Sequence, residues 1–274
     1  MLEILRELCT LDAVSGDEAA VRDYIINKIK DHCEYKIDPL GSIIAFKKGK
    51  KTPAKKVMLD AHMDEVGLII TYITDDGFLK FSAVGGIDTS ILMFRRVKVN
   101  GINGVISGKP IHLISADERK KLPDPHTLYI DIGASSKEDA LKLVSPGDRA
   151  VICGEYTDAG DKIKSKALDD RIGCAVLISM LLKEAEYDFY AVFSVQEEVG
   201  LRGAKAAAYT VAPDAAIVLE GTTAADIAGV EPSRRVCVLG GGPAVSFMDR
   251  ATVYDKAYYN AALKSGITCQ PKAA

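Results

Sequence analysis

The segment Val-Met-Leu-Asp-Ala-His-Met-Asp, residues 57–64, constrains the fold most strongly. Its nearly continuous apolar start is typical of a strand covered on both faces, and therefore of a sheet with helices on either side. The strand ends at His62 and Asp64, so it brings an imidazole and a carboxylate to one edge of that sheet. Ionisable groups are costly to bury unless a partner of opposite charge neutralises them.

Acidic residues recur in similar settings further along the chain. Asp169-Asp170 stand just before a helical pattern, Glu197-Glu198 just after an apolar strand pattern, and Glu220 at the end of the next such pattern. Taken singly, such residues are ordinary helix caps or solvated charges. Their repeated placement at strand ends and helix starts, where open α/β sheets build their sites, favours a metallohydrolase.

The distribution of patterns predicts two kinds of structure. Two N-terminal helices come first, and Ser15-Gly-Asp-Glu18 resembles a capping box that opens the second. We expect residues 1–65 and 165–274 to form an α/β domain with a mixed central sheet and helices on both faces. Short alternating strands with turn dipeptides at Asn100-Gly101 and Asn103-Gly104 predict an inserted β-rich domain at residues 66–164.

Bulk properties exclude several classes of protein. The net charge near −3 gives no reason to expect nucleic acid or an anionic membrane as a partner. The N-terminus does not have the pattern of a signal peptide, and no apolar run is long enough to span a bilayer. The six cysteines are scattered without CxxC spacing, which favours free thiols and a cytoplasmic location.

Hydrolysis with two divalent ions requires a carboxylate that bridges them, further ligands for each ion, and a separate base. The base must be a carboxylate that does not itself bind metal. Asp64, two residues after His62, is placed to hold the imidazole in its metal-binding tautomer. The remaining candidates are His62, Asp169 as the bridging ligand, Glu198 and Glu220 as terminal ligands, and Glu197 as the general base.

Four segments together resemble the M42 family of metallo-aminopeptidases over essentially the whole chain. They are LDAHMDEVG from Leu59, ALDDRIG from Ala167, VQEEVGLRG from Val195 and LEGTT from Leu219. The resemblance implies removal of N-terminal residues from peptides by a dinuclear zinc or cobalt site. It also implies dimerisation through the β-rich insert, a hollow tetrahedral dodecamer, and a cis peptide bond between Asp169 and Asp170.

By motif, His62 and Glu220 would bind one ion and Glu198 the other, with Asp169 between them. Glu220 stands where many relatives have aspartate, and its longer side chain can still reach a metal. Relatives also continue past Ala274 into a segment with a second histidine ligand, whereas no histidine follows His126 here. We therefore expect this sequence to be part of a longer protein.

The sequence leaves two alternatives to an aminopeptidase. A structural shell protein with an incomplete, inactive site is suggested by the missing second histidine. A β-glucan hydrolase is suggested only by endoglucanase labels on some relatives, and the absence of tryptophan argues against sugar binding. A large assembly without tightly held metal would support the shell protein. Cleavage of β-glucan without metal would support the β-glucan hydrolase.

Overall fold

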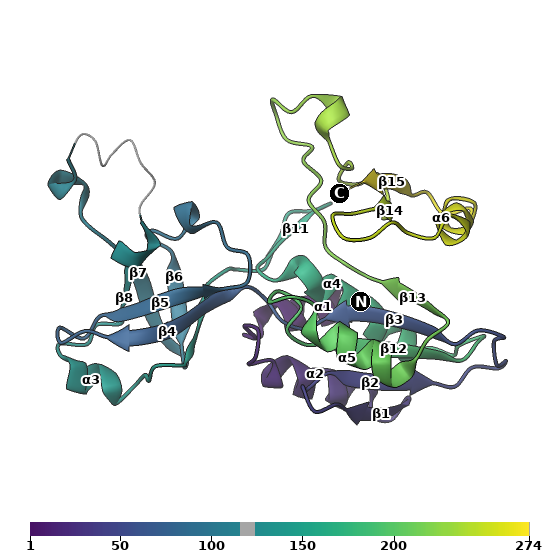
Figure 1. The fold of residues 1–274 in the computed structure, drawn as a ribbon, viewed down its shortest axis with the longest axis horizontal. Helices are drawn as coiled ribbons and strands as arrows, with labels where there is room; N and C mark the ends of the chain where they lie inside the picture. Colours follow the sequence, from purple (N-terminus) through teal and green to yellow (C-terminus); the bar gives the residue numbers. More distant parts are fainter. Residues whose placement is uncertain (116–123, 274) are drawn as a thin grey trace. The chain divides into compact units, whose positions relative to one another are not determined.

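A computed structural model describes residues 1–115 and 124–273 (Figure 1). The chain forms two compact units, Met1–Gly221 and Thr222–Ala274, and each is described by itself. The first unit contains a five-stranded sheet with helices and a closed six-stranded barrel. No helix in the described part of the chain is both long and apolar enough to cross a membrane.

The five-stranded sheet has the order β1-β2-β12-β3-β13. Its strands are β1 (Glu34–Ile37), β2 (Ile43–Lys47), β3 (Val57–His62), β12 (Phe189–Ser194) and β13 (Ala215–Val218). The first two strands pair antiparallel with each other, and β2 also pairs antiparallel with β12. By contrast, β3 lies parallel to both β12 and β13. The mixed sheet that the sequence predicted is thus confirmed, and its three parallel strands all end at the same edge.

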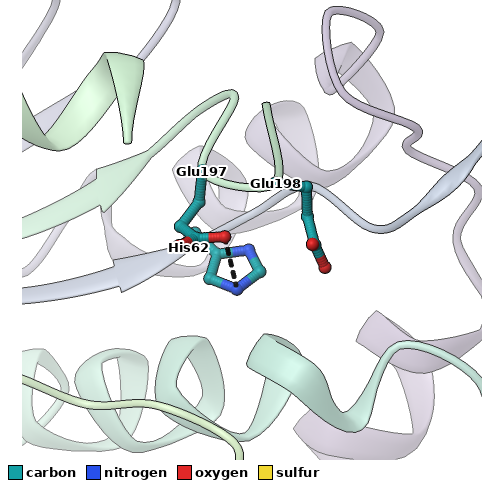
Figure 2. Close-up of side chains that lie close together, drawn as sticks. All are labelled: His62, Glu197 and Glu198. Atoms are coloured by element: carbon teal, nitrogen blue, oxygen red, sulfur yellow. Dashed lines mark ion pairs between the residues drawn. The ribbon is translucent and has the colours of Figure 1, made fainter. Parts of the chain in front are cut away.

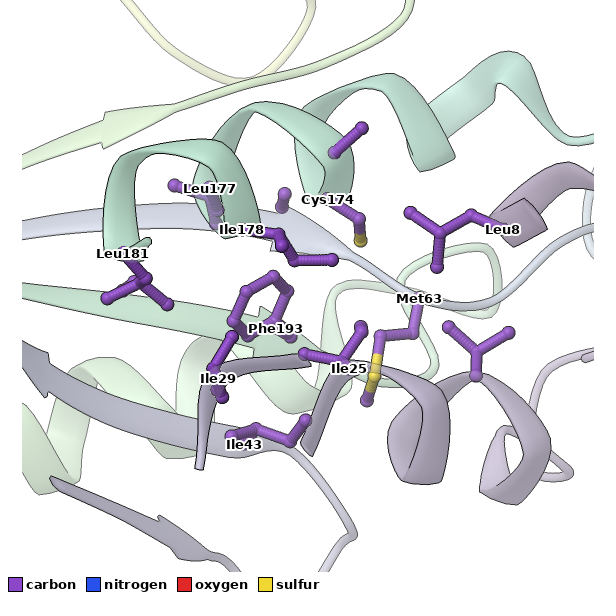
Figure 3. Packing of buried hydrophobic residues seen from close by; sticks show 14 of the residues in the cluster. Leu8, Ile25, Ile29, Ile43, Met63, Cys174, Leu177, Ile178, Leu181 and Phe193 are labelled. Atoms are coloured by element: carbon purple, nitrogen blue, oxygen red, sulfur yellow. The ribbon is translucent and has the colours of Figure 1, made fainter. Parts of the chain in front are cut away.

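Helices cover both faces of this sheet, as expected. One face packs against α1 (Leu2–Thr10), α2 (Ala19–Ile29) and α4 (Leu168–Leu181), and the other against α5 (Arg202–Val211). Alternate strand residues belong to the two cores because successive side chains of a strand point to opposite faces. The first core includes Ile43, Ala45, Leu59, Ala61, Ala191 and Phe193, and Figure 3 shows Phe193 among side chains of α2, α4 and β2. The second includes Ile44, Met58 and Val192.

Residues 67–152 contain the six strands of the barrel, which follow the order β4-β5-β8-β7-β6-β9. Its apolar interior includes Leu68, Ile70, Val97, Ile106 and Ile130, all fully or almost fully buried. The strands are β4 (Gly67–Ile73), β5 (Leu79–Val84), β6 (Arg96–Val99), β7 (Ile102–Ser107), β8 (Tyr129–Asp131) and β9 (Arg149–Ile152). The short helix α3 (Lys137–Leu141) begins after Ser136, whose hydroxyl accepts a hydrogen bond from the Asp139 N–H.

Two turn predictions in the barrel have different outcomes. Asn100 and Gly101 join β6 to β7 with φ of 50° and 81°, as a tight hairpin turn requires. Asn103 and Gly104 were predicted to form a second turn, and this is wrong. They lie inside β7, paired with Lys98 and Val97. A hairpin has only one turn, so only one of two neighbouring Asn-Gly dipeptides can form it. The second dipeptide is part of the paired strand.

The capping box predicted for α2 is also wrong. The residue that precedes the helix is Glu18, and it makes no side-chain capping bond. The Ser15 hydroxyl instead donates to the Asp64 carboxylate at 2.6 Å, and Glu18 accepts from the backbone N–H of Gln196 at 3.2 Å. The segment therefore contacts residues distant in the sequence in place of its own helix.

The second unit, Thr222–Ala274, contains little regular structure. Strand β14 (Ala244–Met248) pairs in parallel with β15 (Gln270–Ala273), and α6 (Lys256–Leu263) precedes β15. Asp255 caps α6 by accepting from the N–H groups of Ala257 and Tyr258. None of its described residues, 222–273, is buried.

Close packing at Gly203 gives a first testable prediction. A Cβ at this position of α5 would lie 2.5 Å from both the backbone N and the backbone O of Val195, just after β12. Gly203→Ala should therefore push α5 from the strand and lower the free energy of unfolding by about 1–3 kcal/mol, measured by denaturant titration. Gly86→Ala is the control, because its Cβ would meet no atom within 4 Å. Equal stability of the two variants would refute the packing argument.

Candidate metal centre

Strand register explains why the predicted site residues meet. His62, the last residue of β3, pairs directly with Ser194, the last residue of β12. The chain leaving β12 reaches Glu197-Glu198 three residues later. On the other side, Val218 of β13 pairs with Asp60, so Glu220 also follows just past the sheet edge. Parallel strands therefore deliver all four residues to one edge.

His62 lies at the centre of a first group. Its Nε2 atom is 3.2 Å from Asp169 Oδ1 and 3.1 Å from Glu220 Oε1. One ligand atom from each of these three residues lies within 4.8 Å of the others, a spacing that could hold one metal ion. Asp169 comes from the start of α4, where the peptide bond to Asp170 is cis. The cis peptide expected from the family resemblance is thus present.

A second group shares the same imidazole. His62, Glu197 and Glu198 also offer three ligand atoms within 4.8 Å of one another. Figure 2 shows both glutamates leaving one loop, with the Glu197 carboxylate above the His62 ring. Glu197 Oε2 lies 4.0 Å from His62 Nε2. The five residues predicted to bind metal or act as the base therefore converge on one site.

Asp64 holds the other side of the imidazole. His62 Nδ1 lies 3.0 Å from the Asp64 backbone carbonyl and 3.4 Å from its Oδ1 atom. An N–H at Nδ1 facing these acceptors leaves Nε2 with its lone pair directed at the acidic groups, as a metal ligand requires. Asp64 is fully buried. Burial raises its pKa, but hydrogen bonds from His62, Ser15 and the Glu197 N–H outweigh this and hold the pKa below its usual range.

A layer behind the ligands was not identified from the sequence. The buried Asp170 carboxylate accepts from the backbone N–H of His62 at 3.2 Å, and Cys174 Sγ donates to the His62 carbonyl at 3.1 Å. Burial raises the pKa of Asp170 to about 9, with Glu220 adding repulsion. The Asp169-Asp170 pair was the available signal for Asp170, but its obvious interpretation was a helix cap. Nothing in the local sequence around Cys174 indicates its contact.

The acidic groups around His62 favour the binding of a cation. Burial raises the pKa of Glu198 to about 7 and also raises that of Glu197. Burial by itself would lower the pKa of His62, but hydrogen bonds to Asp169, Asp64 and Glu220 raise it instead. The acids thus favour a positive charge at Nε2, and a divalent ion would satisfy them more fully than a proton. An imidazole nitrogen with carboxylate oxygens is a donor set that suits zinc and similar ions.

The site is open on one side. The side chain of His62 is 1% exposed, whereas those of Asp169 and Glu220 are 57% and 40% exposed. The imidazole therefore anchors the site in the interior while the carboxylates face solvent, from which a substrate can approach. The other three histidines, His32, His112 and His126, are exposed and belong to neither group. All six cysteines are free thiols.

Comparison with known proteins agrees with this geometry. The family model of the M42 glutamyl aminopeptidases matches residues 41–270. A putative aminopeptidase of Acetivibrio thermocellus is 44% identical over 256 residues, which cover 92% of this chain and 75% of that protein.

Two solved structures have the same fold. One is the TET aminopeptidase from the marine sediment archaeon Thaumarchaeota archaeon SCGC AB-539-E09, with a TM-score of 0.93 at 32% identity, covering 99% of this chain and 80% of that one. The other is the Pyrococcus horikoshii TET1 peptidase, which can assemble into a tetrahedron or a large octahedral shell. Its TM-score is 0.86 at 35% identity, and the match covers 99% of this chain and 84% of that one. The chain belongs to the M42 glutamyl aminopeptidase family and is a hydrolase of the aminopeptidase class.

Proposed function

We propose that the chain removes N-terminal residues from peptides with two divalent ions, zinc or cobalt, held at the edge of the parallel strands. His62, Asp169 and Glu220 would hold one ion, and Glu198 would bind the other, with Asp169 between the two. Convergence of carboxylates from three separate segments on the imidazole of His62 carries the proposal. It implies a zinc-peptidase layout, in which His62, Glu198 and Glu220 come from the C-terminal ends of parallel strands and Asp169 from the start of α4.

When bound, such ions polarise the scissile carbonyl and lower the pKa of a water molecule. The chain's own contribution to proton transfer is Glu197. Its side chain is 26% exposed, so a water molecule can reach the carboxylate. Burial raises its pKa and thereby makes the ionised form a better base. Glu197 takes a proton from the attacking water and passes it to the amine that leaves when the peptide bond breaks.

Asp64 positions His62 and takes no part in proton transfer. It is fully buried, so substrate cannot reach its carboxylate. We expect a peptide's free α-amino group to be held near the carboxylate of Glu198 or Glu220. An ammonium–carboxylate contact of this kind would restrict cleavage to the first residue of a peptide.

The proposal extends to location and assembly. We infer that the protein acts in the cytoplasm, because its six cysteines are all free thiols. In the sequence, the barrel at residues 67–152 falls between β3 and β12. We propose that this barrel forms the dimer contact. Dimers would assemble into a dodecamer, by analogy with the tetrahedron formed by the Pyrococcus horikoshii TET1 peptidase. Native mass measurement tests this assembly.

Metal removal tests the proposed chemistry. Dialysis against a chelator should reduce release of free amino acids from short peptides to background, because the carboxylates alone cannot polarise the carbonyl. Zinc or cobalt should restore activity, whereas magnesium should do so poorly because it prefers octahedral oxygen sites without imidazole. Amino acid release is measured with a blocked N-acetyl peptide as the control. Full activity after complete removal of metal would contradict the proposal.

A further inference from the structure

The loop that carries Glu197 and Glu198 is held by two buried carboxylates. Three successive backbone N–H groups each donate to one of them. Gln196 N–H donates to Glu18 Oε1 at 3.2 Å, and Glu197 N–H donates to Asp64 Oδ1 at 3.0 Å. Glu198 N–H donates to Asp64 Oδ2 at 3.2 Å. The backbone on both sides of the proposed base is therefore fixed by acceptors from the N-terminal part of the chain.

Those acceptors are themselves fixed by the segment Ser15–Glu18. The Ser15 hydroxyl donates to Asp64 Oδ2 at 2.6 Å, the same oxygen that accepts from Glu198 N–H. Glu18 Oε1 also accepts from the Gly16 N–H at 2.7 Å, so one oxygen links this segment to the loop. Ser15 and Glu18 are each 4% exposed. Neither residue belongs to either group of potential metal ligands.

The loop needs this support because its backbone is unfavourable on its own. Gln196 has φ of 54° and Leu201 has φ of 60°, in the left-handed region that L-residues with side chains seldom adopt. Such conformations persist only where the surroundings determine them. Loss of the Glu18 contact would free Gln196 to relax, and the Cα–Cβ directions of the next two residues would rotate with it.

We propose that Ser15 and Glu18 are positioning residues that aim Glu197 at the attacking water and Glu198 at its metal ion. The inference rests on the proposed function for the roles of the two glutamates. It assigns the segment Ser15–Glu18 a part in catalysis that acts through the loop, without contact with substrate or metal.

Glu18→Ala tests the proposal, with Glu18→Gln as the conservative variant that keeps an acceptor oxygen at the same place. Glu18→Ala should lower kcat for a short peptide at least about ten-fold and leave KM within about two-fold. Misaimed groups impair the chemical step more than substrate binding. Titration of the metal-free protein with cobalt, followed by visible absorption, should show half-saturation at a several-fold higher concentration. Glu18→Gln should recover most of both properties.

Asp188→Ala is the matched control, because Asp188 is also a buried carboxylate that accepts from a loop N–H, that of Gly49. It precedes β12, at the end of the strand opposite to Glu197. Asp188→Ala should lower the melting temperature but leave kcat and cobalt affinity unchanged. If Glu18→Ala does not fold, Ser15→Ala takes its place, since it removes only one hydroxyl. That variant should lower kcat several-fold. Ser179→Ala is its control and should not lower kcat, because the Ser179 hydroxyl donates within α4, to the Ala175 carbonyl at 2.7 Å.

Wild-type kcat and cobalt affinity in Glu18→Ala would overturn the inference. Equal losses in Glu18→Ala and Asp188→Ala would overturn it as well, because general destabilisation would then explain both. Failure of the proposed function has a different signature. In that case Glu197→Gln would keep its peptidase activity, while the cobalt titrations would still show whether Glu18 supports the loop.

Discussion

Glu197→Gln is expected to lower kcat by about 10²–10⁴-fold, the usual contribution of a general base. Glutamine keeps the shape of the side chain and cannot accept a proton at any working pH. Because Glu197 Oε2 lies 4.0 Å from His62 Nε2, farther than the atoms of Asp169 and Glu220, metal content should change little. Steady-state kinetics on a short peptide, with metal analysis of the same sample, checks both expectations.

A Glu→Gln change away from the site is the control for the loss of one negative charge. Glu184→Gln removes a carboxylate whose side chain is 86% exposed and should leave kcat unaltered. Burial raises the pKa of Glu197, so activity that depends on its ionised form falls as the pH drops through that raised pKa. The corresponding acid limb of the kcat/KM profile should be absent in Glu197→Gln. A variant that retains more than about a tenth of wild-type kcat would show that another group acts as the base.

The edge of the sheet could be predicted because its signals are local. The apolar segment before His62 indicated a buried strand, and a second apolar segment ended just before Glu197. Parallel strands with crossovers end at the same edge, so the two were expected to meet once the strand type was known. The observed pairing of His62 with Ser194 agrees with that expectation.

Residues that act through long-range contacts could not be predicted in the same way. Ser15 and Glu18 have the spacing of a capping box, and only the folded chain brings Asp64 and Gln196 within reach of them. These contacts join segments that are far apart in the sequence, so they leave no periodic pattern in the sequence of either segment. The Asn103-Gly104 turn failed for a related reason, because strand register, set by the partner strand, decides which dipeptide turns.

His62→Ala should strongly weaken binding of the ion that His62 is proposed to hold with Asp169 and Glu220. Outer-shell residues behind a metal ligand commonly change affinity by about 10–100-fold, so removal of the imidazole itself should exceed about 100-fold. The variant should also lack peptidase activity. Metal content after gel filtration and competition with a chelating dye measure the loss. Binding of metal at wild-type affinity in His62→Ala would contradict the assignment of the site.

Variants of the glutamates separate the two groups of ligands. Glu220→Gln alters only the group with Asp169, and Glu198→Gln only the group with Glu197. Each variant should lower the affinity for one of the two proposed ions and leave the affinity for the other near that of the wild type. A cobalt titration measures both affinities. His62 can bind only one ion through Nε2, so its loss should weaken binding of the ion held with Asp169 and Glu220 more than binding of the ion held by Glu198. If both glutamate variants lost all metal, the groups would act as one site for a single ion.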